Sequence, residues 1–145
     1  QYFCCSNHRM FLEKNEKFYQ KGFALNSTGL IGQIFRDHPN SHELILLSDI
    51  DHKIPIYNKD FDIYCNAEGS GFERLIICKS SKDLDKESII GQEFYTSGFG
   101  GVFNKDMPVG KVVSFTQDED NDYEISIEIF ANPLKDERVF LFQSA

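Results

Sequence analysis

The residue best placed to act as a nucleophile is Ser97, which Gly98 follows directly in a glycine-rich stretch. Small β-barrels can host serine hydrolases, and a chymotrypsin-like order requires a histidine, then an aspartate, then the serine. His52 followed by Asp60 or Asp62 satisfies that order nominally. However, the acid and glycine that usually precede such a serine are missing, and His52 falls in a polar turn. Backbone geometry that demands glycine is the simpler explanation, so we expect no enzymatic activity.

Two polar segments invite comparison with metal sites. The first is a set of histidines and aspartates, namely His38, His42, Asp49, Asp51 and His52, and the second is the acidic run at residues 118–122. Pro39 breaks any helix that would place the first two histidines on one face, and the spacing matches no known ligand pattern. The acidic run lacks the central glycine and the distal glutamate of a calcium loop. We therefore expect solvated loops, with no metal and no cofactor.

The charge of the chain excludes one class of partner. Its net charge is -8 and its pI is about 4.9, whereas proteins that bind a phosphate backbone are usually basic, so nucleic acid is not expected. No run of eighteen apolar residues is present, so no segment is expected to span a bilayer. The sequence begins at Gln1 and shows no signal-peptide pattern. We expect a soluble fragment whose membrane anchor lies upstream.

The chain contains four cysteines: Cys4, Cys5, Cys65 and Cys78. Their spacing forms no CxxC pair and no zinc ribbon. Cys4 and Cys5 are adjacent and would point to opposite faces of a strand, whereas Cys65 and Cys78 could face each other across a hairpin. All four could equally be small buried apolar groups. Both readings stay open at this stage.

The element that would position Ser97 is a tight corner running from Tyr95 to Gly110. It is rich in residues that exclude a helix and permit sharp backbone bends: Gly98, Gly100, Gly101, Pro108 and Gly110. Apolar strand residues lead into this corner and out of it. We therefore predict a shaped corner between two β-strands.

The remaining pattern is that of an all-β protein. Tyr123, Ile125, Ile127, Ile129 and Ala131 alternate with mostly polar residues, which predicts a half-buried strand. The preceding apolar run, residues 109–115, predicts its hairpin partner, with the acidic run as the loop. Further short strands are expected at residues 2–11, 30–35, 44–47, 54–57, 61–67, 75–78, 92–96 and 138–142. Many short strands with frequent turns predict a sandwich or a barrel.

The order of several motifs resembles the MreC family of bacterial rod-shape-determining proteins. The block Thr-Ser-Gly-Phe-Gly-Gly-Val-Phe at residues 96–103, followed by Pro-Val-Gly at residues 108–110, is the most specific part of the match. Gly-Leu-Ile-Gly-Gln-Ile at residues 29–34 precedes it. The resemblance implies two small six-stranded β-barrels. We expect residues 1–53 to form the first barrel, residues 54–113 the second, and residues 114–145 to return to the first.

The same resemblance implies a function without catalysis. Members of this family have one transmembrane helix in the inner membrane and a periplasmic head, and they belong to the elongasome, the machinery of lateral cell-wall synthesis. They bind penicillin-binding protein 2, a class B transpeptidase, favour its active state and maintain cell shape. Contact with other elongasome membrane proteins and self-association are also implied. A periplasmic setting would permit a Cys65–Cys78 disulfide. The alternatives are the barrel hydrolase considered above and a purely structural oligomerisation head.

Aromatic side chains around the second barrel are the candidates for partner binding. They are Phe72, Phe94, Tyr95, Phe99 and Phe103. Most aromatic residues belong to a core, but a small barrel cannot bury them all, and exposed aromatic residues often anchor interfaces. We expect two or three of the five to form an apolar patch that contacts the transpeptidase.

Overall fold

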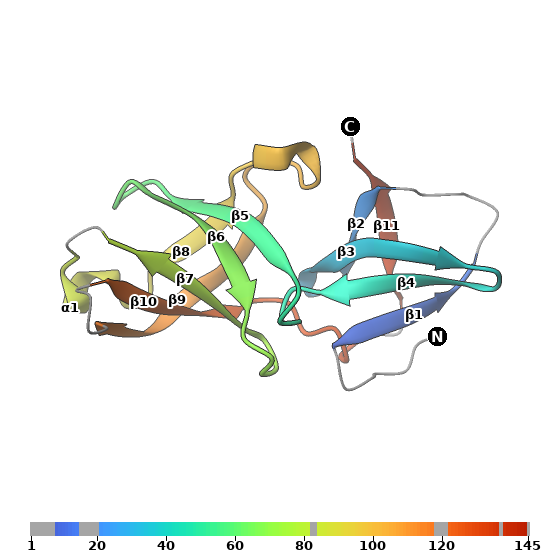
Figure 1. Ribbon diagram of the computed structural model, residues 1–145, viewed down its shortest axis with the longest axis horizontal. Helices are drawn as coiled ribbons and strands as arrows, with labels where there is room; N and C mark the ends of the chain where they lie inside the picture. Colours follow the sequence, from blue (N-terminus) through green and yellow to red (C-terminus); the bar gives the residue numbers. More distant parts are fainter. Residues whose placement is uncertain (1–7, 15–20, 82–83, 118–121, 137, 145) are drawn as a thin grey trace.

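Two β-sheets lie side by side along the long axis of the computed structural model, which describes residues 8–14, 21–81, 84–117, 122–136 and 138–144 (Figure 1). A five-stranded sheet has the order β1-β4-β3-β2-β11, and a closed six-stranded barrel has the order β10-β7-β6-β5-β8-β9. The strands of the sheet are β1 (Arg9–Glu13), β2 (Gly22–Asn26), β3 (Gly29–His38), β4 (Ser41–Leu46) and β11 (Phe140–Gln143). The strands of the barrel are β5 (Lys53–Asn58), β6 (Ile63–Gly69), β7 (Leu75–Ser80), β8 (Glu93–Thr96), β9 (Pro108–Gln117) and β10 (Tyr123–Ile129).

The helical content of the described residues is two short turns, α1 (Lys86–Ile89) and the 3-10 turn η1 (Phe99–Gly101). The predicted all-β class is therefore confirmed. No helix in the described part of the chain combines the length and the apolar character needed to cross a membrane.

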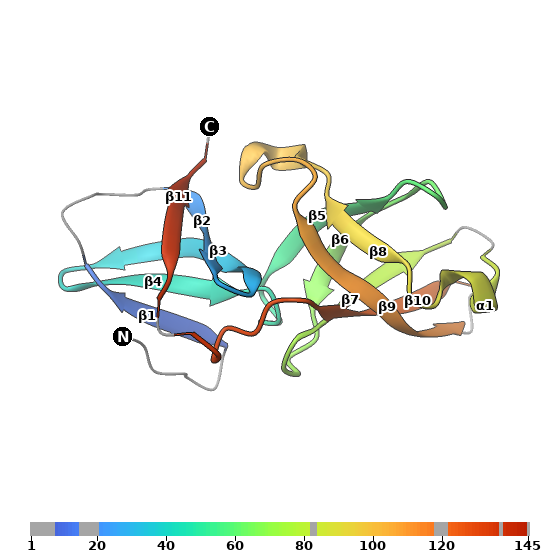
Figure 2. The same ribbon diagram turned by 180° about the vertical axis from the view of Figure 1, so that it is seen from behind.

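The five-stranded sheet differs from the expected first barrel. Within the described residues it does not close, and β1 and β11 are its two edges (Figure 2). The C-terminal strand does return to it as expected, because β11 pairs antiparallel with β2, from Phe140 opposite Leu25 to Gln143 opposite Gly22. The end of β9 and the whole of β10, which were also expected to return, pair within the barrel.

The barrel also extends beyond the boundary that the sequence suggested. β9 runs continuously to Gln117, across the expected limit at residue 113, and it pairs with β10 from Tyr123 opposite Gln117 to Ile129 opposite Gly110. This ladder confirms the predicted hairpin. Among the described residues, both β9 and β10 pair only with strands of the barrel, so residues 114–117 and the whole of β10 belong with the closed barrel, and the stretch that returns to the sheet is β11.

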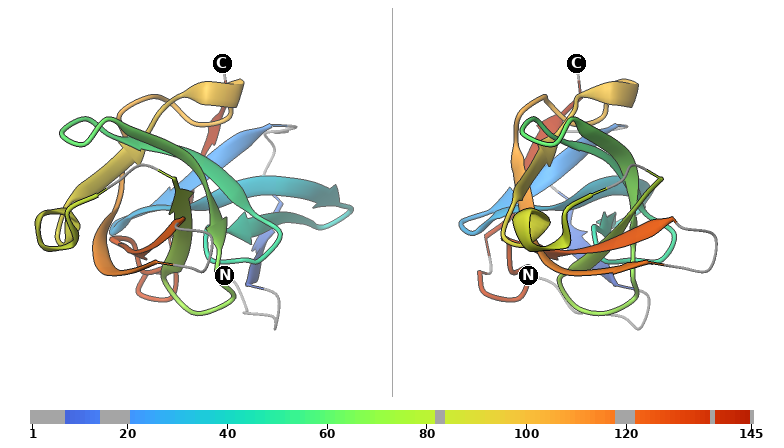
Figure 3. Two further views of the ribbon diagram at one scale, coloured as in Figure 1. Left: turned by 60° about the vertical axis from the view of Figure 1, so that its left-hand side comes forward. Right: turned by 90° about the vertical axis from the view of Figure 1, so that its left-hand side faces the viewer.

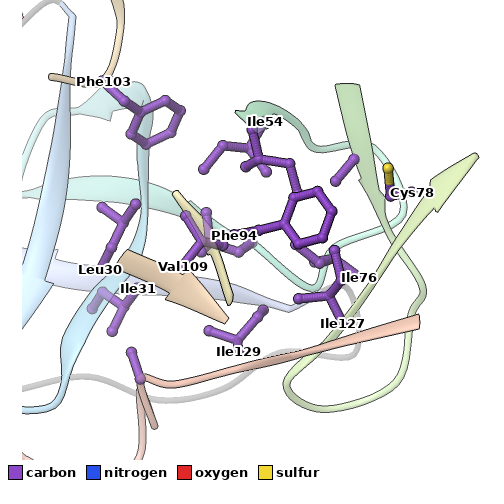
Figure 4. Packing of buried hydrophobic residues seen from close by; sticks show 14 of the residues in the cluster. Leu30, Ile31, Ile54, Ile76, Cys78, Phe94, Phe103, Val109, Ile127 and Ile129 are labelled. Carbon is purple, nitrogen blue, oxygen red and sulfur yellow. The ribbon is translucent and has the colours of Figure 1, made fainter. Parts of the chain in front are cut away.

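The barrel interior is filled by the alternating residues of its strands. On β10, Ile125, Ile127 and Ile129 point inward and are at most 4% exposed, as their alternation predicted. Figure 4 shows Ile127 and Ile129 converging with Phe94 and Ile76. The buried residues of the sheet and the barrel form one continuous cluster. The two sheets are therefore packed against each other, not merely linked.

The passage from sheet to barrel is compact. The backbone N–H of Gly71, in the β6–β7 turn, donates to the carbonyl of Ser48, and the N–H of Gly69 donates to the carbonyl of His52. A Cβ on Gly69 would lie 1.9 Å from the carbonyl oxygen of Asp49, so a side chain cannot fit here. The β6–β7 turn is thereby held against the segment that leads into the barrel.

A disulfide joins Cys65 on β6 to Cys78 on β7, with their Cα atoms 6.0 Å apart. Of the two readings left open by the sequence, the structure thus shows the cross-strand bond. Cys78 is fully buried inside the barrel, whereas Cys65 is half-buried. Cys4 and Cys5 lie outside the described residues.

Candidate interaction surface

Two of the five aromatic residues proposed for partner binding are core residues. Phe94 is fully buried, because on β8 it alternates with outward-facing Glu93 and Tyr95 and points into the barrel (Figure 4). Phe103 is 4% exposed and lies between the two sheets, with its ring 6.0 Å from those of Phe23 and His52. Neither side chain can form part of an exposed patch.

The two exposed members of the set are far apart. Phe72 is 72% exposed in the β6–β7 turn, and Phe99 is 64% exposed in η1. Figures 1 and 3 show that turn and η1 on opposite sides of the molecule. Tyr95 is half-buried on β8. The predicted aromatic residues therefore do not form a single patch.

Phe99 instead extends a stack of aromatic rings on the outer face of the barrel. Its ring centroid is 5.8 Å from that of Tyr64, which is in turn 5.4 Å from that of Tyr57, with interplanar angles of 20° and 17°. Tyr57 and Tyr64 are direct cross-strand neighbours on β5 and β6. Tyr64 is 55% exposed, so Tyr64 and Phe99 present flat apolar surface to solvent. Such pairs stabilise each other beyond simple burial.

Sequence reasoning missed Tyr64, although a signal was available. Residues 61–67 were predicted as a strand with alternating character, and the structure has Ile63 and Ala67 inside the barrel. Residues between inward positions of a strand face outward. An aromatic residue at such a position, opposite a second aromatic residue in a hairpin, indicates an exposed aromatic pair.

Hydrogen bonds fix the polar surroundings of the stack. The hydroxyl of Tyr57 donates to Oδ1 of Asp106, and this bond is the main cause that raises the pKa of Tyr57 to about 12. The hydroxyl of Tyr95 donates to Oε1 of Glu93 over 3.2 Å, which raises the pKa of Tyr95. Both phenols are therefore neutral at physiological pH.

Two lysines complete the rim of this surface. The ammonium groups of Lys59 and Lys105 each lie 5.9 Å from the ring centroid of Tyr57, within range of a cation–π interaction. An apolar centre surrounded by charged groups is the usual anatomy of a protein interface. We call Tyr57, Tyr64 and Phe99 with these lysines the aromatic surface.

The glycine-rich corner positions the aromatic surface. Gly98, Gly100 and Gly101 have φ values of 82°, 80° and 71°, a region that L side chains rarely adopt. The hydroxyl of Thr96 donates to the carbonyl of Asn104 and accepts from the N–H of Met107, which closes the base of the corner. The corner thus turns Phe99 outward and Phe103 inward.

Pro108 and Gly110 belong to the strand that leaves this corner. Pro108 begins β9, where its missing N–H is tolerated. A Cβ on Gly110 would lie 2.3 Å from the carbonyl oxygen of Glu128 on β10. Glycine at this position therefore permits close approach of the two backbones.

The residues of the nominal hydrolase triad have other partners. The Oγ of Ser97 accepts a hydrogen bond from the N–H of Phe99 at 3.3 Å. His52 is buried, its Nε2 is paired with Oε1 of Gln33 at 2.9 Å, and burial lowers its pKa to about 4. In the part of the chain that the structure describes, no group of three or more metal-ligating side chains converges.

Several side chains of the first polar segment bind neighbours outside that set instead. Nδ1 of His42 lies 2.6 Å from Asp37, and Nε2 of His38 lies 2.7 Å from Glu43. Arg9 also binds Glu43, at 2.8 Å, and Asp49, at 3.0 Å. These contacts tie β1, β3 and β4 together.

Comparison with known proteins gives a consistent result. The family description "Rod shape-determining protein MreC, barrel core" matches residues 14–143. The cell shape-determining protein MreC of Haemophilus influenzae is 32% identical over 112 residues, which cover 77% of this chain and 30% of that protein. The chain therefore spans about a third of the length of this relative.

Solved structures share the fold. The crystal structure of MreC from Pseudomonas aeruginosa superposes with a TM-score of 0.78 at 22% identity, covering 94% of this chain and 89% of that one. MreC in a complex with penicillin-binding protein 2 from Helicobacter pylori superposes with a TM-score of 0.69 at 17% identity, covering 93% and 86%. With the family match over most of its length, the chain belongs to the MreC family of rod shape-determining proteins.

Proposed function

We infer that this chain is a non-enzymatic scaffold that binds penicillin-binding protein 2, a class B transpeptidase, and helps to maintain cell shape. The observation that carries the proposal is the complex of an MreC with this enzyme from Helicobacter pylori, whose MreC has the same fold. The other support is the exposed aromatic surface.

We assign the contact to the aromatic surface because it has the properties of an interface centre. Tyr64 and Phe99 are large, exposed and already stacked, so little side-chain freedom is lost on binding. Lys59, Lys105 and Asp106 contact the adjoining Tyr57, and charged groups at the rim of an interface give orientation more than affinity. The β6–β7 turn, which carries Phe72, lies on the opposite side of the molecule from η1, so a compact contact centred on Phe99 does not include Phe72.

Activation of the transpeptidase would follow from selective binding. A scaffold shifts its partner toward one state only by the difference of its affinities for the two states. We propose that the chain binds the active state more tightly. Transpeptidase turnover measured with and without the chain tests this step, and an unchanged rate at saturating chain would contradict it.

The setting of the proposed contact is the periplasm. We propose that the chain is the head of a single-pass inner-membrane protein, that other elongasome membrane proteins lie nearby, and that the full-length protein self-associates. A purely structural oligomerisation head is the competing function. Light scattering with and without the transpeptidase separates the two, because a scaffold forms a mixed complex and an oligomerisation head forms only assemblies of itself.

Alanine substitution tests the contact directly. Tyr64→Ala and Phe99→Ala should each weaken binding of the transpeptidase ectodomain by about tenfold or more, as expected for central aromatic anchors. Phe72→Ala is the matched control, because it removes an aromatic ring of similar exposure from the β6–β7 turn on the opposite side. Titration calorimetry gives the affinities, and thermal melting shows that each variant is folded. Full affinity in both anchor variants, or a loss confined to Phe72→Ala, would refute the assignment.

A further inference from the structure

A cleft of about 650 Å³ opens beside the aromatic surface, and the two proposed anchors of the scaffold contact, Tyr64 and Phe99, do not line it. It lies between the β5–β6 turn, the start of β8 and the end of the glycine corner. Its lining residues are Tyr57, Asn58, Lys59, Asp60, Gly91, Gln92, Glu93, Tyr95 and Asp106. This volume lies within the range of small-molecule sites.

Two carboxylates in the cleft are oriented for recognition. Asp106 accepts from the Tyr57 hydroxyl through Oδ1, and Glu93 accepts from the Tyr95 hydroxyl through Oε1. Among the described residues, no hydrogen bond to Oδ2 of Asp106 or Oε2 of Glu93 is present. Each carboxylate is thus held by a tyrosine through one oxygen and can accept from a ligand through the other.

Side-chain amides add a second kind of polar group. Nδ2 of Asn58 donates to Oε1 of Gln92 at 3.2 Å and to the carbonyl of Glu93 at 2.9 Å. Oδ1 of Asn58 accepts from the N–H of Phe61, so this amide is fixed in the wall. The bond to Oε1 of Gln92 fixes that amide with its Nε2 as a donor. The cleft therefore offers both oriented acceptors and an oriented donor, beside the rings of Tyr57 and Tyr95.

Charge balance decides between classes of ligand. Asp60, Glu93 and Asp106 contribute three carboxylates, while Lys59 lines the cleft and Lys105 lies 5.9 Å from the centroid of the Tyr57 ring. The two ammonium groups already occupy positions near the ring that a cationic ligand would take. The carboxylates repel an anion. A neutral ligand rich in hydroxyl groups fits both constraints.

We propose that this cleft binds a neutral saccharide. The half-buried ring of Tyr95 offers apolar surface for the C–H face of a sugar ring, whereas Tyr57, only 3% exposed, serves to hold Asp106 in place. The oriented carboxylates and amides bind the hydroxyl groups of the sugar. Planar groups with two polar atoms suit vicinal hydroxyls because they can engage two of them at once. Tyr64 and Phe99 do not line the cleft, so the proposed anchors for the transpeptidase are separate from the saccharide site, although Tyr57 and Lys59 border both.

The test is a titration of the ¹⁵N-labelled chain, followed by NMR, with chitotriose as the probe. We expect binding with a dissociation constant on the order of 1 mM, with shifts concentrated at residues 57–60 and 91–95. Gln92→Ala and Tyr95→Phe should each weaken binding by about tenfold; the second keeps the ring and removes only the hydroxyl that holds Glu93. Phe72→Ala, in the β6–β7 turn and outside the cleft, should bind as the wild type does.

Three results would overturn the proposal. They are an absence of chemical-shift changes at a chitotriose concentration about twenty times the expected dissociation constant, chemical-shift changes confined to residues outside the cleft, and wild-type affinity in both cleft variants. Trilysine is the competing probe, and tighter binding of trilysine than of chitotriose in the same cleft would replace the saccharide by a cation. Failure of these tests leaves transpeptidase binding unaffected, because Tyr64 and Phe99 do not line the cleft.

Discussion

Loss of the Cys65–Cys78 disulfide should lower the free energy of unfolding by about 3 kcal/mol. The bond joins residues 13 apart in sequence, and the loop-entropy relation assigns roughly this value to a loop of that length. The cross-link also supports a short seam, since β6 and β7 pair through Glu68 opposite Ile77 and Gly69 opposite Ile76. Against a total stability of about 5–15 kcal/mol, this is a large share.

The assay compares oxidised and reduced protein in a Cys4→Ser, Cys5→Ser background, which prevents exchange with the other thiols. With a urea dependence of about 2 kcal/mol per molar, the unfolding midpoint should fall by about 1.5 M on reduction. Cys65→Ala is the covalent control and should match the reduced protein. Cys65 is the residue to replace because it is half-buried, whereas Cys78 is fully buried and its substitution would disturb the core.

Equal midpoints and equal urea dependence for the oxidised and reduced forms would refute this reasoning. Non-reducing mass spectrometry must first show that the oxidised sample contains the bond. If that sample shows two free thiols after preparation in an oxidising buffer, the cross-strand geometry described here is wrong.

Two further predictions concern pH and the β9–β10 seam. Burial lowers the pKa of His52 from 6.5 to about 4. Between these two pH values, His52 is protonated in the unfolded chain and neutral in the folded chain. The free energy of unfolding should therefore fall by about 3 kcal/mol as the pH drops from about 6.5 to about 4. This contribution should be absent in His52→Gln, and urea titration at several pH values measures it. An equal dependence of the free energy of unfolding on pH in both proteins would contradict the prediction. Gly110→Ala should cost about 3 kcal/mol or more, because the new Cβ meets the Glu128 carbonyl at 2.3 Å. Gly100→Ala, with a φ of 80° but open space around it, should cost only about 1–2 kcal/mol, and equal losses of melting temperature would argue against the steric cause.

Local patterns in the sequence predicted local structure well. The alternation of Ile125, Ile127 and Ile129 predicted a half-buried strand, and β10 has these residues in the barrel interior. The apolar run before the acidic loop predicted its hairpin partner, which is β9. Both inferences depend on neighbours along the chain, where the pleat of a strand dictates which side chains share a face.

Closure and burial were harder to predict because they depend on distant pairing. Nothing local distinguishes a strand that returns to the sheet from one that completes the barrel, and β9 and β10 were divided wrongly for that reason. Phe94 and Phe103 were counted as surface candidates. Phe94 is buried because its position on β8 faces the barrel interior, and Phe103 is buried because it packs against Phe23 of the other sheet. Tyr64 was missed because its exposure becomes meaningful only when Tyr57 and Phe99 are seen beside it.

The position of β11 has a consequence for synthesis. The sheet is interrupted after β4 by the whole barrel, and Phe140–Gln143 joins it only at the end of the chain. A polypeptide that emerges from its N-terminus onward therefore completes every strand of the barrel before the last strand of the sheet exists. The barrel can acquire its shape while translation or export is still under way. Until β11 has paired with β2, one edge of β2 is open. A chain stalled before residue 140 would therefore expose an unpaired strand that can associate with other chains.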